Sequence, residues 1–326
     1  LAVSISEFFG LITLVLNERR TRNREPLPPR CTYRCRNICV QLLKETAPIA
    51  ASALVMNCVS FVDLLTVTRT LSISAALDTE YFNTVFGGIY ADCGGLAGLP
   101  NFMYGSYTGI AMSLFMLIPS FAGMTEKTAA PEIAAAWERG DTAALSDKIA
   151  MQLRAGAVIA CPACFGAAAL AEPILSMLYK TRAAEISVCL NSFIILCMGG
   201  LFMVMSSAMF GIFQSINKAH IPLVLMIGSV LIKLLLNPLL ISIPRLNIAG
   251  AALSSVIGYV FMTVGGAIAL RKHLPRKIGI FKAITPPLVC GICCGFVAFI
   301  VHEMLIRVVD ATVNVIFSTI LFMQYY

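Results

Sequence analysis

Apolar runs of bilayer-spanning length recur along the whole chain, and they constrain its fold more than any other feature. A transmembrane helix needs about 20 mostly apolar residues. Hydrophobic residues fill 58% of the 326 positions and charged residues only 13%, whereas a soluble domain is about 45–50% apolar and about 25% charged. The sequence therefore predicts an all-α membrane protein built as a polytopic helical bundle.

We expect about nine transmembrane helices, which places the two termini on opposite sides of the membrane. Lys and Arg residues gather in alternate connections, above all 18–45 and 271–282, while the connection 72–103 has none. By the positive-inside rule the first span runs from outside to inside, and the C-terminus is cytoplasmic. The net charge of +7 mostly reflects this topology, so we infer no nucleic-acid partner. The predicted spans are 1–17, 46–71, 104–125, 150–178, 187–213, 220–243, 248–270, 283–306 and 311–326.

No pattern in the sequence indicates an enzyme, a metal site or a cofactor. Cys161 and Cys164 have the spacing of a redox motif, but they fall inside an apolar span, where a thiolate is costly. The three histidines are scattered and fit no zinc motif. The sequence shows no phosphate-binding glycine loop with its lysine, no zincin pair and no nucleophile with a base. We therefore predict a protein that is not an enzyme.

Ionisable residues inside the spans are the candidate functional groups, because a charge near the bilayer centre costs at least about 2.5–3.5 kcal/mol. Lys233 is the deepest, at the centre of LMIGSVLIKLLLNPLLIS (225–242). Asn237 follows one turn later on the same helical face. Two interpretations of Lys233 stay open: a contact for a substrate anion, or a structural ion pair. Other in-span charges lie near span ends, where interfacial anchoring explains them: Arg154, Glu172 and Glu303.

The second predicted span carries a polar stripe, which must face protein or water rather than lipid. Within it, Asp63 is the ionisable member, and Arg69 lies close to the outer end of the span, placed to meet an anion. For both residues, function and structural pairing stay open. Glu7, in the first span, is a similar candidate. The stripe steps by three residues through Asn57, Ser60, Asp63 and Thr66.

Two stretches with glycines four residues apart favour close packing of helices. They are GSYTG (105–109) and GICCG (291–295). The pattern is common in membrane helices, so it indicates packing and no particular function.

Residues 126–156 predict two cytoplasmic helices joined by a tight turn. Pro131 suits the first turn of a helix, and the alanine-rich stretch after it favours a helix that ends near Gly140. Asp141 or Thr142 then caps the next helix.

Three segments, taken in order, resemble one family. They resemble stage V sporulation protein B and its polysaccharide-biosynthesis relatives, in the multidrug/oligosaccharidyl-lipid/polysaccharide (MOP) flippase superfamily. The most specific pieces are the turn 214–220, the helix 233–237 and the small-residue start at Gly250. The three segments are YGSYTGIAMSLFMLIPSFAGMTEKTAAPEIAAAWERGD, LAEPILSMLY and GIFQSINKAHIPLVLMIGSVLIKLLLNPLLISIPRLNIAGAALSSVIGY.

The resemblance implies a MATE-like fold of fourteen helices, with two six-helix lobes and two further helices. The chain, which opens at Leu1 inside an apolar run, then corresponds to helices six to fourteen of an N-terminally truncated member that lacks most of its first lobe. Residues 1–17 would be the last helix of the first lobe, 18–40 a basic cytoplasmic linker, 41–270 the second lobe and 271–326 the additional C-terminal helix pair.

The resemblance also implies a function: a flippase in a bacterial cytoplasmic membrane that moves a lipid-linked, polyprenyl pyrophosphate precursor of cell wall or polysaccharide by alternating access. Lys233, aided by Arg69 and Asn237, would contact the pyrophosphate in the central cavity. Charge balance, or coupling to a proton or sodium ion, would then fall to Asp63, Glu7 and Asn57. The glycan stays open, as does a role in sporulation, in peptidoglycan of the vegetative wall or in capsule.

Two other functions stay open. A multidrug and toxin extrusion antiporter of the same superfamily would use Asp63 or Glu7 to bind a cation and a cationic drug, and an acidic cavity would favour it. A scaffold that recruits wall-synthesis proteins without transport would tolerate the loss of all four charges, Glu7, Asp63, Arg69 and Lys233. The counted charges are balanced, so the resemblance favours the flippase.

Overall fold

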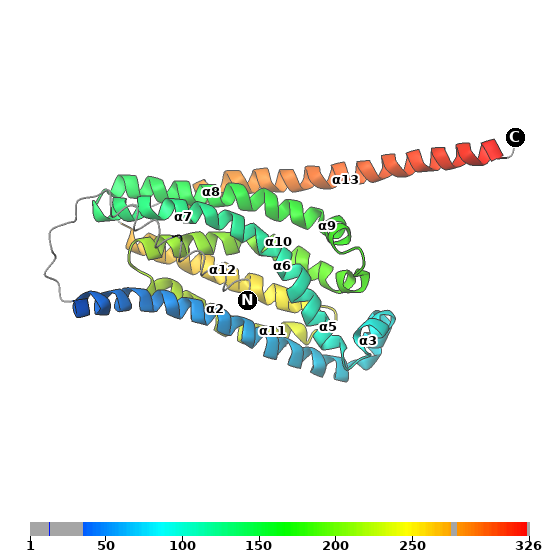
Figure 1. Ribbon diagram of the computed structural model, residues 1–326, viewed down its shortest axis with the longest axis horizontal. Coiled ribbons are helices and arrows are strands. Elements are labelled where there is room, and N and C mark those ends of the chain that lie inside the picture. Colours follow the sequence, from blue (N-terminus) through cyan, green and yellow to red (C-terminus); the bar gives the residue numbers. More distant parts are fainter. Residues whose placement is uncertain (1–12, 14–34, 275–278, 325–326) are drawn as a thin grey trace. The chain divides into compact units, whose positions relative to one another are not determined.

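The computed structural model describes residue 13 and residues 35–274 and 279–324, and every regular element among them is a helix. The chain divides into two compact units, residues 1–46 and residues 47–326. In the first unit the structure describes Thr13 and the beginning of α2 (Cys35–Leu77). The second unit holds the rest of α2 and the other described helices (Figure 1).

Long helices dominate the second unit. After α2 come the short helices α3 (Thr79–Phe86), η1 (Gly87–Ile89) and α4 (Tyr90–Cys93). One long, interrupted helix follows, made of α5 (Leu99–Ser106), the π-helical η2 (Tyr107–Met112), α6 (Ser113–Phe115) and α7 (Leu117–Glu138). The remaining elements are α8 (Thr142–Ala169), α9 (Ala171–Leu178), α10 (Ala183–Ser215), α11 (His220–Ile241), α12 (Asn247–His273) and α13 (Ile280–Gln324).

Seven helices of the described residues are long and apolar enough to cross a membrane, so the predicted all-α, multi-pass architecture is confirmed. Each overlaps one of the predicted spans between residues 46 and 306. Of the predicted span 1–17, only Thr13 lies within the described residues. The predicted span 283–306 and the described part of the predicted span 311–326 lie on one continuous helix, α13, because residues 307–310 hold neither proline nor glycine to end it.

α10 is the central helix of the second unit. It contacts α5, α7, α8, α9, α11 and α12, and 61% of its apolar window is buried, the largest share among the seven helices. A helix that is apolar all round is suited to such a position. Two clusters of buried apolar side chains form along it, one around Phe115 and Leu196, the other around Ile149 and Met205.

α7 and α8 form the predicted hairpin. Gly140 takes a left-handed φ of 68° in the turn, and the Asp141 carboxylate accepts hydrogen bonds from the N–H groups of Ala143 and Ala144. The predicted cap at Asp141 is therefore confirmed. The predicted helix start at Pro131 is wrong, because Pro131 lies inside α7. Packing of α7 on α8 and α10 outweighs the cost of about 3 kcal/mol for an interior proline.

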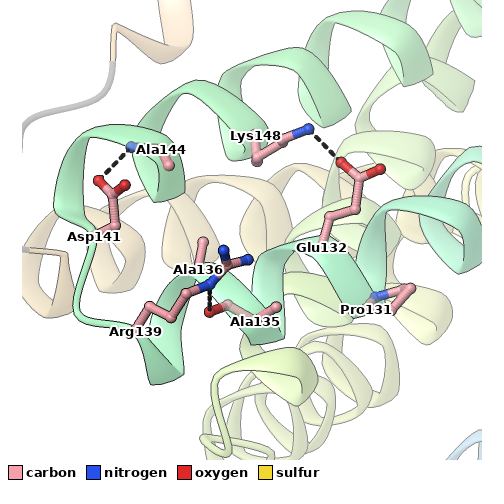
Figure 2. Close-up of a pocket in the computed structure, with 8 residues that line it drawn as sticks. All are labelled: Pro131, Glu132, Ala135, Ala136, Arg139, Asp141, Ala144 and Lys148. Atoms are coloured by element: carbon pink, nitrogen blue, oxygen red, sulfur yellow. Dashed lines mark hydrogen bonds and ion pairs between the residues drawn. The ribbon is translucent and has the colours of Figure 1, made fainter.

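Four charged side chains near the turn of this hairpin, Glu132, Arg139, Asp141 and Lys148, are engaged with one another or with the backbone (Figure 2). They line a cavity of about 420 Å³. Lys148 on α8 pairs with Glu132 on α7, and Arg139 Nε donates to the Ala135 carbonyl at 3.0 Å. Because these groups are exposed, the ion pair contributes about 0–1 kcal/mol. We infer that the residues lining this cavity help to stabilise the turn, and we assign the cavity no other role.

Removal of the Asp141 cap tests the contribution of this turn. We expect Asp141→Ala to lower the free energy of unfolding by about 1 kcal/mol, because two N–H groups at the start of α8 lose their acceptor. Asp141→Asn keeps an oxygen acceptor and should be close to wild type. Thermal unfolding of the purified protein in detergent measures both. Equal losses for the two variants would mean that the charge, not the cap, supplies the stability.

α13 packs lengthwise on α8 (Figure 1). A Cβ built on Gly291 would lie 2.5 Å from the Cβ of Cys161, and one on Gly295 would lie 2.9 Å from the Cβ of Phe165. The prediction of close packing at GICCG is thus confirmed. In GSYTG, no atom of the described residues lies within 4 Å of a Cβ built on either glycine. The buried positions of this part of α13 recur every four residues: Ala283, Pro287, Gly291 and Gly295.

Candidate functional site

The buried lysine of α11 pairs with the carboxylate of α2. Lys233 Nζ donates to Asp63 Oδ2 at 2.5 Å. The Lys233 residue is only 7% exposed, and the Asp63 side chain is 17% exposed. The sequence had left two interpretations of Lys233 open, an anion contact or a structural ion pair. In this conformation Lys233 forms the ion pair.

Local sequence turns Lys233 inward. The buried positions of α11 from Ser229 onward recur every four residues, which places them on one helical face. That face lies against α12, where Gly258 permits a close approach. A Cβ on Gly258 would lie 2.6 Å from Ser229 Oγ and 3.7 Å from Lys233 Cγ. The leucines between these positions, such as Leu231 and Leu235, are exposed and suited to lipid.

Asn237 extends the pair into a polar network across three helices. Its amide nitrogen donates to Asp63 Oδ1 at 3.0 Å and to Thr66 Oγ1 at 3.3 Å. Its amide oxygen accepts from the hydroxyl of Ser254 on α12. Asn237 is fully buried, and a buried amide is tolerated when its donors and acceptors are paired. The network therefore satisfies Asn237 and fixes the Asp63 carboxylate from two sides.

A cavity of about 230 Å³ opens on this network. Its polar lining comes from the ion pair and from serines on α2, α10 and α11, and its apolar lining includes five methionines, whose flexible thioethers adapt to different shapes. Met112 ends η2 and Met116 separates α6 from α7, so the wall includes the irregular part of that helix. Such π-helical turns are frequent at functional sites. The lining residues are Ser60, Asp63, Met112, Met116, Met203, Ser206, Ser207, Phe210, Met226, Ser229, Val230, Lys233, Tyr259 and Met262.

The structure brings together three of the six predicted site residues: Lys233, Asn237 and Asp63. Arg69 does not join them. It lies six residues after Asp63, which on a helix is a different face, and it is exposed and outside the cavity lining. Glu7 lies outside the described residues, as does the side chain of Asn57. The roles proposed for all six stay predictions.

Three features of the site were not singled out from the sequence. Ser254 completes the network, and the methionine wall forms from four separate segments, so neither has a local signal. The third is Glu126, a half-buried carboxylate on α7. The sequence places it one residue beyond the predicted span 104–125, where an acid is ordinary. In the structure the helix continues, and Ser207 of the cavity wall donates to Glu126 Oε2 at 3.1 Å.

Comparison with known families bears on this site. The family model described as "Lipid II flippase MurJ" matches residues 105–323. That stretch is well over half of the chain and runs from α5 through most of α13, including Lys233, Asn237 and Ser254. A comparison with curated proteins finds no match.

The family match decides between the functions considered above. It supports the MOP superfamily and indicates a family of transporters, and it does not favour the drug antiporter. The narrower resemblance to stage V sporulation protein B, the truncation and the cytoplasmic C-terminus stay predictions.

Proposed function

The chain belongs to the family of lipid II flippases named MurJ, and on that basis we propose that it moves a lipid-linked, polyprenyl pyrophosphate precursor of peptidoglycan or a related wall polymer across the bacterial cytoplasmic membrane. The family match over most of the helices that build the cavity, α2 excepted, is the observation that carries the proposal. Alternating access of the two lobes of a fourteen-helix fold would supply the movement. A sporulation role belongs to the same proposal.

The ion pair suggests how the cavity would handle an anion. With no anion bound, Asp63 neutralises Lys233, and burial of the pair is tolerable because each charge has its partner. A pyrophosphate that enters the cavity offers oxygens that compete with Asp63 for the ammonium. Asn237 would keep the released carboxylate hydrogen-bonded. In this proposal Asp63 is the resident anion that the substrate replaces.

The other predicted residues take supporting roles. Arg69, exposed toward the predicted outer end of α2, would meet the headgroup on its way rather than inside the cavity. Glu7 and Asn57 would balance charge from the part of the chain nearer the first lobe.

A translocation assay tests the function. The protein is expressed in bacteria depleted of their own precursor flippase. We expect the fraction of lipid-linked precursor that can be labelled from outside to recover toward the undepleted level. A correctly inserted protein that leaves the precursor entirely on the inner leaflet would contradict the proposal.

A further inference from the structure

Glu126 is a carboxylate in the helix interface beside the cavity. It lies on α7 facing α10, where Ser207 donates to it at 3.1 Å. Gly211, one turn after Ser207, lies beside it: a Cβ there would be in ordinary van der Waals contact, 3.6 Å from Glu126 Oε2. The side chain is half-buried. A carboxylate withdrawn from water requires a hydrogen-bond donor, a cation or a proton.

No described Lys, Arg or His lies within ion-pair distance of Glu126. On α7 itself, Lys127 is the adjacent cation, and its side chain is exposed. From α8, Gln152 approaches the backbone of Glu126: with the amide turned so that both its groups are paired, its oxygen accepts from the Glu126 N–H at 3.1 Å. Arg154, also on α8, is exposed. α6, which also packs on α7, carries no ionisable residue. One hydroxyl is therefore the side-chain partner that the structure gives this carboxylate.

Ser207 connects Glu126 to the cavity. The same residue lines the cavity and hydrogen-bonds to the carboxylate. A hydroxyl both donates and accepts, so it can pass a proton between the carboxylate and water in the cavity. On its other side, Glu126 packs among side chains of α7, α8 and α10 that reach Gly211 and Ser215, with no space there for a water molecule. Glu126 thus lies between the cavity and the end of α10 that the predicted topology places in the cytoplasm.

We propose that Glu126 is a proton-binding site of the cavity, with Ser207 as its proton relay. The carboxylate takes a proton from water at Ser207 and becomes a neutral acid, which removes the cost of an unpaired charge in the interface. It returns the proton when water reaches it again. As a deepening of the proposed flippase function, this makes the proton the coupling ion and places its site on α7, apart from Asp63, whose charge Lys233 already neutralises.

Infrared spectroscopy of the purified protein in proteoliposomes tests proton binding without any substrate. We expect a carboxylic-acid C=O band that titrates with pH in the wild type and is lost in Glu126→Gln. Glu132→Gln, at an exposed ion pair on the same helix, is the matched control and should leave the band unchanged. In Ser207→Ala the band should persist to higher pH, because the donor that stabilises the carboxylate is gone. A wild-type spectrum without a titrating band that depends on Glu126 would overturn the proposal.

Transport measured against pH separates this inference from the proposed function. We expect wild-type translocation to change at least threefold across the pH range in which the band titrates, and Glu126→Gln to lose that dependence. Translocation with the same pH profile in both proteins would overturn the coupling while leaving the flippase intact. A titrating Glu126 band in a protein that moves no lipid-linked precursor would overturn the function and leave the proton site.

Discussion

Lys233→Met should remove most of the translocation activity and should also destabilise the protein. The substitution keeps a long side chain but removes the ammonium, so the proposed anion contact is lost and Asp63 remains partly buried without a counter-charge. Losing one partner of a buried pair costs about 3–5 kcal/mol. Losing a charged hydrogen bond to the substrate costs about 1.5–3 kcal/mol, or roughly 10–100-fold in transport. Thermal unfolding in detergent and the translocation assay measure the two effects.

The double variant Asp63→Asn/Lys233→Met separates a structural role from a functional one. It removes both charges and keeps at position 63 an amide oxygen that can accept from Asn237, so stability should return to near the wild-type level. Transport should stay lost, because no ammonium remains for the substrate. Wild-type transport by the stable double variant would show that the pair only joins α2 to α11, and would exclude Lys233 as an anion contact.

Gly291→Leu should detach α13 from α8. A Cβ there would lie 2.7 Å from the backbone carbon of Cys161, and backbone cannot move aside as a side chain can. We expect a loss of about 3 kcal/mol in unfolding free energy, at the upper end for overpacking. Cys161, which is fully buried, should become reactive to a membrane-permeant thiol reagent. Mass spectrometry of the peptide that contains Cys161 measures the labelling.

The matched control is Gly105→Leu, at the first glycine of the other small-residue motif. No atom of the described residues lies within 4 Å of its Cβ position, and the residue is exposed. Leucine is also the better helix former. Wild-type stability is therefore expected. A loss at Gly105 as large as that at Gly291 would mean that the motif, rather than the contact with Cys161, sets the cost.

The features that could be predicted from the sequence are those that depend on a local pattern of residues. The spans were placed well because the length of an apolar run is a local property, and Lys233 and Asn237 were put on one face because four residues make one helical turn. Their partner could not be identified, since Asp63 lies 170 positions from Lys233 and only the packing of α2, α11 and α12 brings the two together. The predicted helix start at Pro131 was wrong for the opposite reason: packing against neighbouring helices outweighed a strong local signal.

The neutrality of the Asp63–Lys233 pair has a consequence for energetics. Moving one elementary charge through the membrane potential changes its energy by about 2.3 kcal/mol per 100 mV. Two opposite charges that move together sum to zero, so a rearrangement of α2 and α11 that keeps the pair intact gains nothing from the voltage. The driving force of a transport cycle built on this pair then comes from the charge of the substrate and from protons. When the empty cavity returns, the pair moves no net charge through the membrane potential.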